Sequence, residues 1–383
     1  MRKGWEYKKL GEYVKEYSVK NKLNENISVY SVTNSQGFCK DYFGKEVASK
    51  DKSTYKIVPF GFFAYNPSRI NVGSIDWQAQ EDRVIVSPLY NVFSVSAKLK
   101  QQYLLYYLKS PLTIHYIDSV ATGTVRLNLK FSMLKEFIVP VPSIAKQEYI
   151  VSELDKINEL IRLKKEQLKD FDNLAQSLFY EMFGDPVENE KGWEVKKLGE
   201  IGEFKNGLNF SKDEKGHSIK FLGVSDFQNK KSIASNQLAY ISLSERVQED
   251  YLLKTGDIVF VRSNGKKELI GRSVKMYITE PTTYSGFCIR CRITDEKVDK
   301  DYIAILLKTP IIRQFMTNSG RGCNISNLNQ KVLNSIPTIL PPLPLQRLFA
   351  QRIEQIEREK SEVQKSIQDL ETLLASRMQY WFE

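Results

Sequence analysis

The sequence predicts an α+β protein in which one unit is used twice: a domain of mixed α/β structure followed by a long helix. Two observations favour this fold class. Apolar residues keep a heptad spacing over two long stretches, and the segments around these stretches recur at a nearly constant offset. Two copies are too few for a solenoid. The repeat therefore indicates an internal duplication with pseudo-two-fold symmetry.

The heptad spacing predicts one helix over residues 146–183 and a second over residues 345–383. Spacings of three and four residues alternate between the apolar positions, which is the 3.5-residue repeat of a coiled-coil seam. One apolar stripe on a charged helix needs a partner, so we expect the two helices to pack on each other. The alternative is a core helix in each of two separate domains. The expected seam residues are Ile150, Leu154, Ile157, Ile161, Leu168, Phe171, Ile353, Ile356, Val363, Ile367, Leu370 and Leu374.

The segments that precede the helices are repeated as well. Residues 4–12 (GWEYKKLGE) recur as residues 192–200 (GWEVKKLGE), and residues 103–111 match residues 302–310. The offset grows from 188 to 199 between these two matches, so the middle of the second copy is longer. Similar edges around a changed middle indicate one scaffold that carries two different binding surfaces.

The repeats define two domains, residues 1–145 and residues 184–344, each of mixed structure. Apolar runs predict strands over residues 83–86, 91–95, 258–261 and 287–293. Helices are expected before Pro111 and Pro310, and each should end at its proline. The proline-rich stretches 139–142 and 340–344 are predicted to be extended and to lead into the long helices. Gly184-Asp185-Pro186 should end the first long helix.

The net charge of +10 is unevenly distributed along the chain. Residues 1–145 carry +8 and residues 184–340 carry +5, whereas residues 146–183 carry −2 and residues 341–383 carry −1. A basic excess confined to the two mixed domains suits a polyanion such as nucleic acid. The alternative is that the protein simply comes from a basic proteome.

Two pairs of loops supply the candidate nucleic-acid contacts. Arginine and asparagine make bidentate contacts to guanine and adenine, and glycine allows close approach of the backbone to a phosphate. A plain surface turn is the alternative for each loop. The candidates in the first domain are Asn66, Ser68, Arg69, Arg83, Thr124, Arg126 and Asn128. Those in the second are Arg262, Ser263, Asn264, Lys266, Lys267, Arg272, Arg321, Asn324 and Asn327.

The sequence contains no catalytic or metal-binding pattern that would support an enzyme. Cys288 and Cys291 form a C-x-x-C pair without the further ligands that zinc requires. Gly265-Lys266 lacks the earlier glycine of a phosphate-binding loop. No run of about 18 apolar residues and no signal peptide is present, and the four cysteines fit a reducing compartment. We therefore expect a soluble cytoplasmic protein that binds no cofactor or metal.

Three motifs recur in the same order in both halves of the chain: GWE-x-KKLGE at the start, equivalent loops at Gly123 and Gly322, and a proline–glutamine motif before each helix. In the last motif Pro142 and Pro341 precede Gln147 and Gln346 by five residues. In these motifs the chain resembles the specificity subunit of a type I restriction–modification system. The resemblance covers essentially the whole chain, and the repetition of the motifs in this order carries more weight than any one of them.

This resemblance implies two target-recognition domains separated by an antiparallel coiled coil. Each domain would recognise one half of a bipartite DNA sequence, and the helices would set the spacer. Two methyltransferase subunits, which bind S-adenosylmethionine and methylate adenine at N6, would dock on the helices. A restriction and translocation subunit, which uses Mg and ATP, would join them.

The polar residues that interrupt the seam, Lys164, Lys360 and Arg377, depart from an ideal coiled coil. They are expected to fix its register or to face the methyltransferase. The alternatives to DNA recognition are a coiled-coil interaction scaffold, an inactive allele, and a fused methyltransferase or nuclease.

Overall fold

A computed structural model describes residues 2–40, 51–121, 128–210, 215–227, 232–263, 269–318 and 328–383. The chain divides into two compact units. Unit 1 comprises Met1–Gln167 and Val363–Glu383, and unit 2 comprises Leu168–Glu362. Each unit therefore contains one mixed domain together with a part of each long helix.

The two long helices are α4 (Ile144–Phe183) and α9 (Leu343–Phe382). Both begin two residues earlier than the predicted starts at residues 146 and 345. The prediction that residues 340–344 are extended is wrong at its end, because Leu343 and Pro344 already belong to α9. Proline is tolerated in a first helical turn, where backbone N–H groups have no partner within the helix. Gly184, at φ +75°, ends α4 as predicted.

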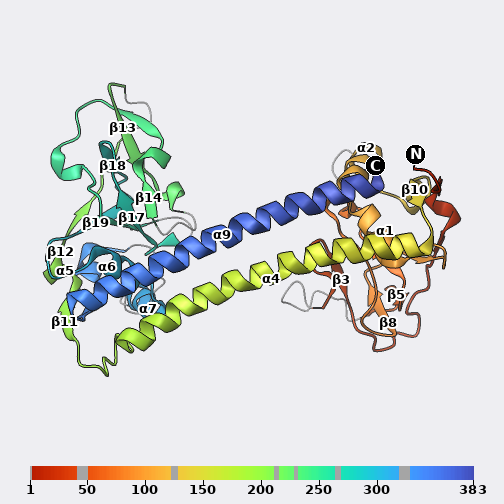
Figure 1. Ribbon diagram of the computed structural model, residues 1–383, viewed down its shortest axis with the longest axis horizontal. Coiled ribbons are helices and arrows are strands. Elements are labelled where there is room, and N and C mark those ends of the chain that lie inside the picture. The colour runs from red at the N-terminus through yellow and green to blue at the C-terminus, as the bar shows by residue number, and fades with distance from the viewer. Residues whose placement is uncertain are drawn as a thin grey trace. The chain divides into compact units, whose positions relative to one another are not determined.

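The helices pack antiparallel within each unit (Figure 1). In unit 1, Lys165 of α4 forms an ion pair of 2.8 Å with Glu371 of α9, and Glu153 lies further back along α4 opposite Arg377. In unit 2, Lys360 of α9 pairs with Asp172 of α4 at 2.5 Å. Two of the polar seam residues, Lys360 and Arg377, thus form ion pairs with the opposite helix.

The expected seam residues lie on the inner side of the helices. Those that are buried are Ile150, Leu154, Ile157, Ile161, Ile353, Ile356, Val363 and Ile367. Those that are half-buried are Leu168, Phe171, Leu370 and Leu374. Burial along this stripe supplies the hydrophobic stabilisation that a lone amphipathic helix lacks.

The mixed domain of unit 1 is built on an antiparallel sheet with the strand order β2-β9-β6-β7. A separate ribbon pairs β1 with β10, directly before α4. The strands are β1 (Glu6–Lys9), β2 (Val14–Glu16), β3 (Ser31–Thr33), β4 (Gly37–Cys39), β5 (Lys56–Pro59), β6 (Phe63–Tyr65), β7 (Ile75–Trp77), β8 (Arg83–Val86), β9 (Asn91–Val95) and β10 (Ile138–Val141). The helices are α1 (Gln101–Leu108), α2 (Pro111–Val120) and α3 (Phe131–Leu134).

The mixed domain of unit 2 has a five-stranded sheet with the order β12-β19-β16-β17-β14 and a three-stranded sheet, β15-β13-β18. Its strands are β11 (Glu194–Lys197), β12 (Gly202–Asn206), β13 (His217–Leu222), β14 (Ser232–Ala234), β15 (Tyr240–Leu243), β16 (Ile258–Val261), β17 (Ser273–Tyr277), β18 (Thr282–Tyr284), β19 (Cys288–Ile293) and β20 (Pro337–Leu340). Its helices are α5 (Leu198–Ile201), α6 (Lys300–Leu306), α7 (Pro310–Asn318) and α8 (Gln330–Asn334). The order β12-β19-β16-β17 repeats the order β2-β9-β6-β7 of unit 1, and the β11–β20 ribbon repeats β1–β10.

The predicted strands over residues 83–86, 91–95 and 258–261 are confirmed, and the fourth begins one residue late, at Cys288. Pro111 and Pro310 were expected to end a helix, and in the structure each also begins the next helix. α1 ends at Leu108, Ser110 caps the next helix by accepting from the Thr113 N–H, and Pro111 occupies the first turn of α2. Pro310 likewise begins α7. A proline therefore separates two consecutive helices in each unit.

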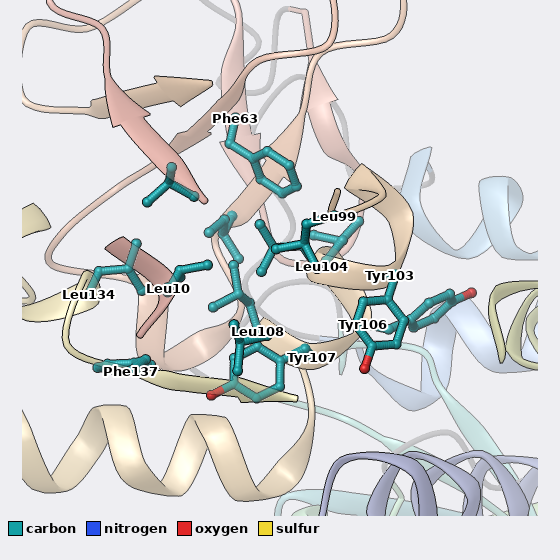
Figure 2. Packing of buried hydrophobic residues seen from close by; sticks show 14 of the residues in the cluster. Leu10, Phe63, Leu99, Tyr103, Leu104, Tyr106, Tyr107, Leu108, Leu134 and Phe137 are labelled. Carbon is teal, nitrogen blue, oxygen red and sulfur yellow. The ribbon is translucent and has the colours of Figure 1, made fainter. Parts of the chain in front are cut away.

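Helix α1 lies at the centre of the unit 1 core. Figure 2 shows Tyr103, Leu104, Tyr107 and Leu108 among apolar side chains from the strands and loops around them. The Tyr103 hydroxyl donates to the Pro140 carbonyl at 2.7 Å, which ties α1 to β10. In unit 2 the Tyr302 hydroxyl of α6 donates to the Ile339 carbonyl of β20 at 3.0 Å. The same polar tie therefore recurs at the offset of 199.

A buried glutamine joins each long helix to its mixed domain. The Gln147 side-chain amide donates to the carbonyls of Lys98 and Pro142, and its oxygen accepts from the Lys100 N–H, all at 2.9–3.0 Å. Gln346 makes the equivalent three bonds, with Lys297, Pro341 and Asp299. Both side chains are almost completely buried. Each glutamine thus satisfies backbone groups at the turn before α1 or α6 and at the strand end before α4 or α9.

No helix among the described residues is both long enough and apolar enough to cross a membrane.

Replacing Gln346 by Met should lower the free energy of unfolding by about 2–3 kcal/mol, because one buried and two part-buried hydrogen bonds to backbone groups are lost. Thermal or urea unfolding measures this. Gln368→Met is the matched control, since Gln368 is exposed on the same helix. Equal unfolding midpoints for the two variants would contradict the role given to Gln346.

Candidate nucleic-acid interface

The loop that follows β6 holds three of the candidate residues of unit 1. The Asn66 side-chain oxygen accepts from the Ser68 N–H at 3.0 Å, and its carbonyl accepts from the Arg69 N–H at 3.0 Å. Gly73, at φ +84°, then closes the loop, and the Ser74 carbonyl accepts from the Asn66 N–H at 3.2 Å. Asn66 therefore organises the loop, whereas Ser68 and Arg69 are exposed on it.

A second segment is brought against this loop from far along the chain. The Leu129 N–H donates to the Pro67 carbonyl at 3.0 Å, and the Leu129 carbonyl accepts from the Tyr65 hydroxyl at 3.0 Å. Asn91 in turn donates to the Tyr65 hydroxyl at 2.9 Å. Burial raises the pKa of Tyr65, so this hydroxyl remains a donor. The exposed candidate Asn128 thereby lies next to the loop that carries Ser68 and Arg69.

Unit 2 repeats this junction with different side chains. The loop after β16 begins at Arg262, whose carbonyl accepts from the Leu328 N–H at 2.8 Å. This bond is the counterpart of the one between Leu129 and Pro67. Arg272 lies immediately before β17, and its carbonyl accepts from the Val261 N–H at 2.9 Å. The structure therefore brings Arg262, Ser263 and Arg272 to one end of the sheet.

A further arginine adds positive charge at this end of unit 2. Arg313 lies on α7, one turn before Met316. The Met316 sulfur lies 3.9 Å from where a Cβ on Gly271 would be, so this part of α7 is close to the residue before Arg272. Burial and the nearby charge of Arg272 lower the pKa of Arg313. The sequence interpretation missed Arg313, because nothing in the sequence places α7 beside the β16–β17 turn.

Arg83 is not brought together with the other candidates. It begins β8 opposite Pro59, whereas Asn66 follows the far end of β6. Its guanidinium forms an ion pair of 2.6 Å with Glu25. Eight candidates lie outside the residues that the structure describes, namely Thr124, Arg126, Asn264, Lys266, Lys267, Arg321, Asn324 and Asn327.

The described residues contain no group of three or more His, Cys, Asp or Glu side chains that could hold a metal ion. Cys288 and Cys291 are buried on opposite faces of β19, in different apolar clusters. Burial raises the pKa of both thiols, and that of Cys288 reaches about 12.

Comparison with known families matches most of the chain to one domain model. The model is described as the type I restriction modification DNA specificity domain, and it matches twice, at residues 2–170 and 190–372. The chain belongs to this specificity family. The two matches coincide with the internal repeat that the sequence motifs and the sheet order define.

Curated members of the specificity family are similar over much of the chain. The StySPI specificity subunit of Salmonella potsdam is 24% identical over 297 residues, covering 73% of this chain and 64% of its own length. The EcoKI specificity subunit of Escherichia coli is 23% identical over 281 residues, covering 69% and 60%. The matched region thus spans less than two thirds of these two relatives.

Two solved structures have the same fold as this chain. A chain from a study of complex assembly and conformational transition of the type I R-M system has a TM-score of 0.66 at 18% identity, covering 99% of this chain and 97% of that one. The HsdS subunit from Thermoanaerobacter tengcongensis has a TM-score of 0.50 at 18% identity, with 100% and 97% covered. These similarities extend along both repeats of the specificity fold.

Replacing Tyr65 by Phe should release the second segment from the loop after β6. Loss of the hydroxyl leaves the Leu129 carbonyl and the Asn91 amide without this partner, which should cost about 1–2 kcal/mol of unfolding free energy. Hydrogen exchange at the Leu129 amide should become faster. Tyr116→Phe, at a partly exposed position on α2, should change neither quantity. Unchanged exchange in Tyr65→Phe would contradict this assignment.

Proposed function

We propose that this chain is the DNA-recognition subunit of a type I restriction–modification complex and that it carries no catalytic site itself. The domains at residues 1–145 and 184–344 would each recognise one half of a bipartite site. Membership of the specificity family supports this function. So does the basic excess of these two domains, +8 over residues 1–145 and +5 over residues 184–340.

The observation that carries the proposal is the repeated junction of two loops. In both units a loop after the central strand receives a backbone hydrogen bond from a segment about 60 residues later, at Leu129 in one and Leu328 in the other. The scaffold at this point is the same, but the side chains differ: Ser68 and Arg69 in unit 1, Arg262 and Ser263 in unit 2. One scaffold with two sets of polar side chains suits two different half-sites.

The chemistry of these side chains divides between affinity and specificity. Arginines that meet phosphates supply binding that weakens as salt rises, because counterions are released from the DNA. Arginine and asparagine that reach base edges supply discrimination between sequences. Arg69, Asn128, Arg262 and Arg272 are the described residues proposed for these contacts.

Catalysis would come from partners. Two copies of a methyltransferase subunit are proposed to dock on the helices at residues 146–183 and 345–383 and to methylate adenine at N6, using S-adenosylmethionine that they bind. A restriction and translocation subunit, with Mg and ATP, would join them. The assembly is proposed to act in the cytoplasm.

The function predicts a split methylation motif. Expression of this chain with the methyltransferase subunit of its system, followed by genome-wide mapping of modified bases, should show one methylated adenine in each half of a bipartite sequence. Exchange of residues 1–145 for those of another family member should change one half of the motif and leave the other intact.

Two results would argue against this function. A soluble complex that produces no new methylation would favour the scaffold or an inactive allele. Methyl transfer by the isolated chain would show that it is an enzyme.

The helices are proposed to set the spacer between the two halves. Deletion of residues 162–168 and 361–367 removes one heptad from each helix and preserves the seam spacing. Each helix becomes shorter by about 10 Å. The methylated motif should keep both halves and change its spacer length, and an unchanged spacer would contradict the role of the helices.

A further inference from the structure

Two large apolar side chains stand exposed beside the repeated loop junction. Leu89 in unit 1 is 78% exposed, and Phe287 in unit 2 is 58% exposed. A single exposed apolar residue needs no explanation. The exposure of Leu89 and Phe287 does need an explanation, because they occupy the same place in both units, within the part of the repeat where the sequences differ.

The turns that carry them have the same hydrogen bonds. In unit 1 the Ser87 hydroxyl accepts from the Leu89 N–H at 3.5 Å, and the Ser87 carbonyl accepts from the Tyr90 N–H at 3.1 Å. In unit 2 the Ser285 hydroxyl and carbonyl accept in the same way from the N–H groups of Phe287 and Cys288, at 3.2 and 2.8 Å. Each turn therefore presents its third residue outward.

Strand register places both residues opposite the candidate loops. The Arg262 N–H donates to the Phe287 carbonyl at 2.8 Å, so Phe287 lies directly across from Arg262. In unit 1, β6 and β9 pair Tyr65 with Asn91, and Leu89 lies in the turn that leads into β9. Tyr90, directly after Leu89, interacts with Asn66 and Arg69 of the loop after β6. Pro67 and Arg262 are the residues that accept the equivalent bonds from Leu129 and Leu328.

Other contacts hold the backbone of each turn in place. The Lys56 ammonium donates to the Tyr90 carbonyl at 2.6 Å, directly after Leu89. In unit 2, the Gly286 N–H donates to the Leu208 carbonyl at 2.7 Å. The Asn209 side chain packs against Gly286 so closely that a Cβ placed on this glycine would lie 1.9 Å from the Asn209 side-chain oxygen. The exposed side chains are thus presented by rigid turns, which reduces the entropy lost on binding.

We propose that Leu89 and Phe287 are apolar contacts to the DNA duplex, each pressed against a base step of its own half-site. This inference rests on the proposed function. Apolar side chains of this size insert between or against bases in proteins that bend DNA, where phosphate contacts on either side hold the duplex in place. Arg69 and Arg262 lie on the loops beside Leu89 and Phe287 and are suited to make those phosphate contacts.

The test uses the complex of this chain with its methyltransferase and duplexes that contain the mapped site. 2-Aminopurine at successive positions in each half reports local unstacking through increased fluorescence. Phe287→Ala should weaken binding roughly tenfold, as truncation of a side chain stacked on a base does. It should also abolish the fluorescence increase in one half-site only. Leu89→Ala should do the same in the other half.

Two further variants serve as controls. Phe60→Ala removes a side chain that is 59% exposed on the turn before β6, at the opposite end of that strand, and should leave affinity and fluorescence unchanged. Phe287→Leu should retain most of the binding, because leucine occupies the equivalent position in unit 1. The three side chains substituted in these four variants are exposed, so thermal unfolding should match that of the unmodified complex.

The outcomes separate the inference from the function. If the unmodified complex binds its site and the alanine variants behave like Phe60→Ala, the inference is wrong and the function stands. Loss of methyltransferase association instead of DNA contact would assign these side chains to a protein interface and overturn the inference. Failure of the unmodified complex to bind any duplex would overturn both.

Discussion

Each mixed domain depends on one buried amide for its connection to the long helix that follows. Gln147 and Gln346 each make three hydrogen bonds to backbone groups, one buried and two part-buried. These bonds fix the first turn of α4 or α9 to the turn before α1 or α6. Because burying unpaired backbone groups costs free energy, an apolar side chain cannot replace this amide. The direction in which each helix leaves its domain is therefore set by hydrogen bonding as well as by apolar packing.

The duplicated scaffold separates what must stay constant from what can vary. The strand before each long helix, the tyrosine tie to that strand and the buried glutamine recur at an offset of 199. The loops after β6 and β16 behave differently. Their backbone hydrogen bonds recur in both units, but their side chains are exposed or half-buried and differ between the units. Packing constrains the first set, whereas the second set is free to adapt to a ligand.

Much of the fold could be predicted because periodicity and repetition are visible in a sequence. Heptad spacing marks Ile150 or Ile353 as inward-facing whatever the partner helix is. The candidate loops were found by composition, yet composition did not distinguish Arg83, which pairs with Glu25 and belongs to the separate β5–β8 sheet. It also missed Arg313 and the exposure of Leu89, since both depend on which strands and helices become neighbours. The Ser-x-apolar pattern at residues 87–89 and 285–287 was present in the sequence but becomes meaningful only once strand register is known.

Unit 1 is discontinuous, which has a consequence for how the chain folds during synthesis. Its core includes Trp381 and Phe382, and the Phe382 ring lies 5.4 Å from that of Tyr103 in α1. Unit 1 therefore cannot complete its core until Trp381 and Phe382 have left the ribosome. At about 5–20 residues per second, this delay is on the order of tens of seconds after residue 167 is made. A chain that stops before Trp381 therefore leaves unit 1, rather than unit 2, with an open core. Completion of the domain made first thus depends on residues that are made more than 200 positions later.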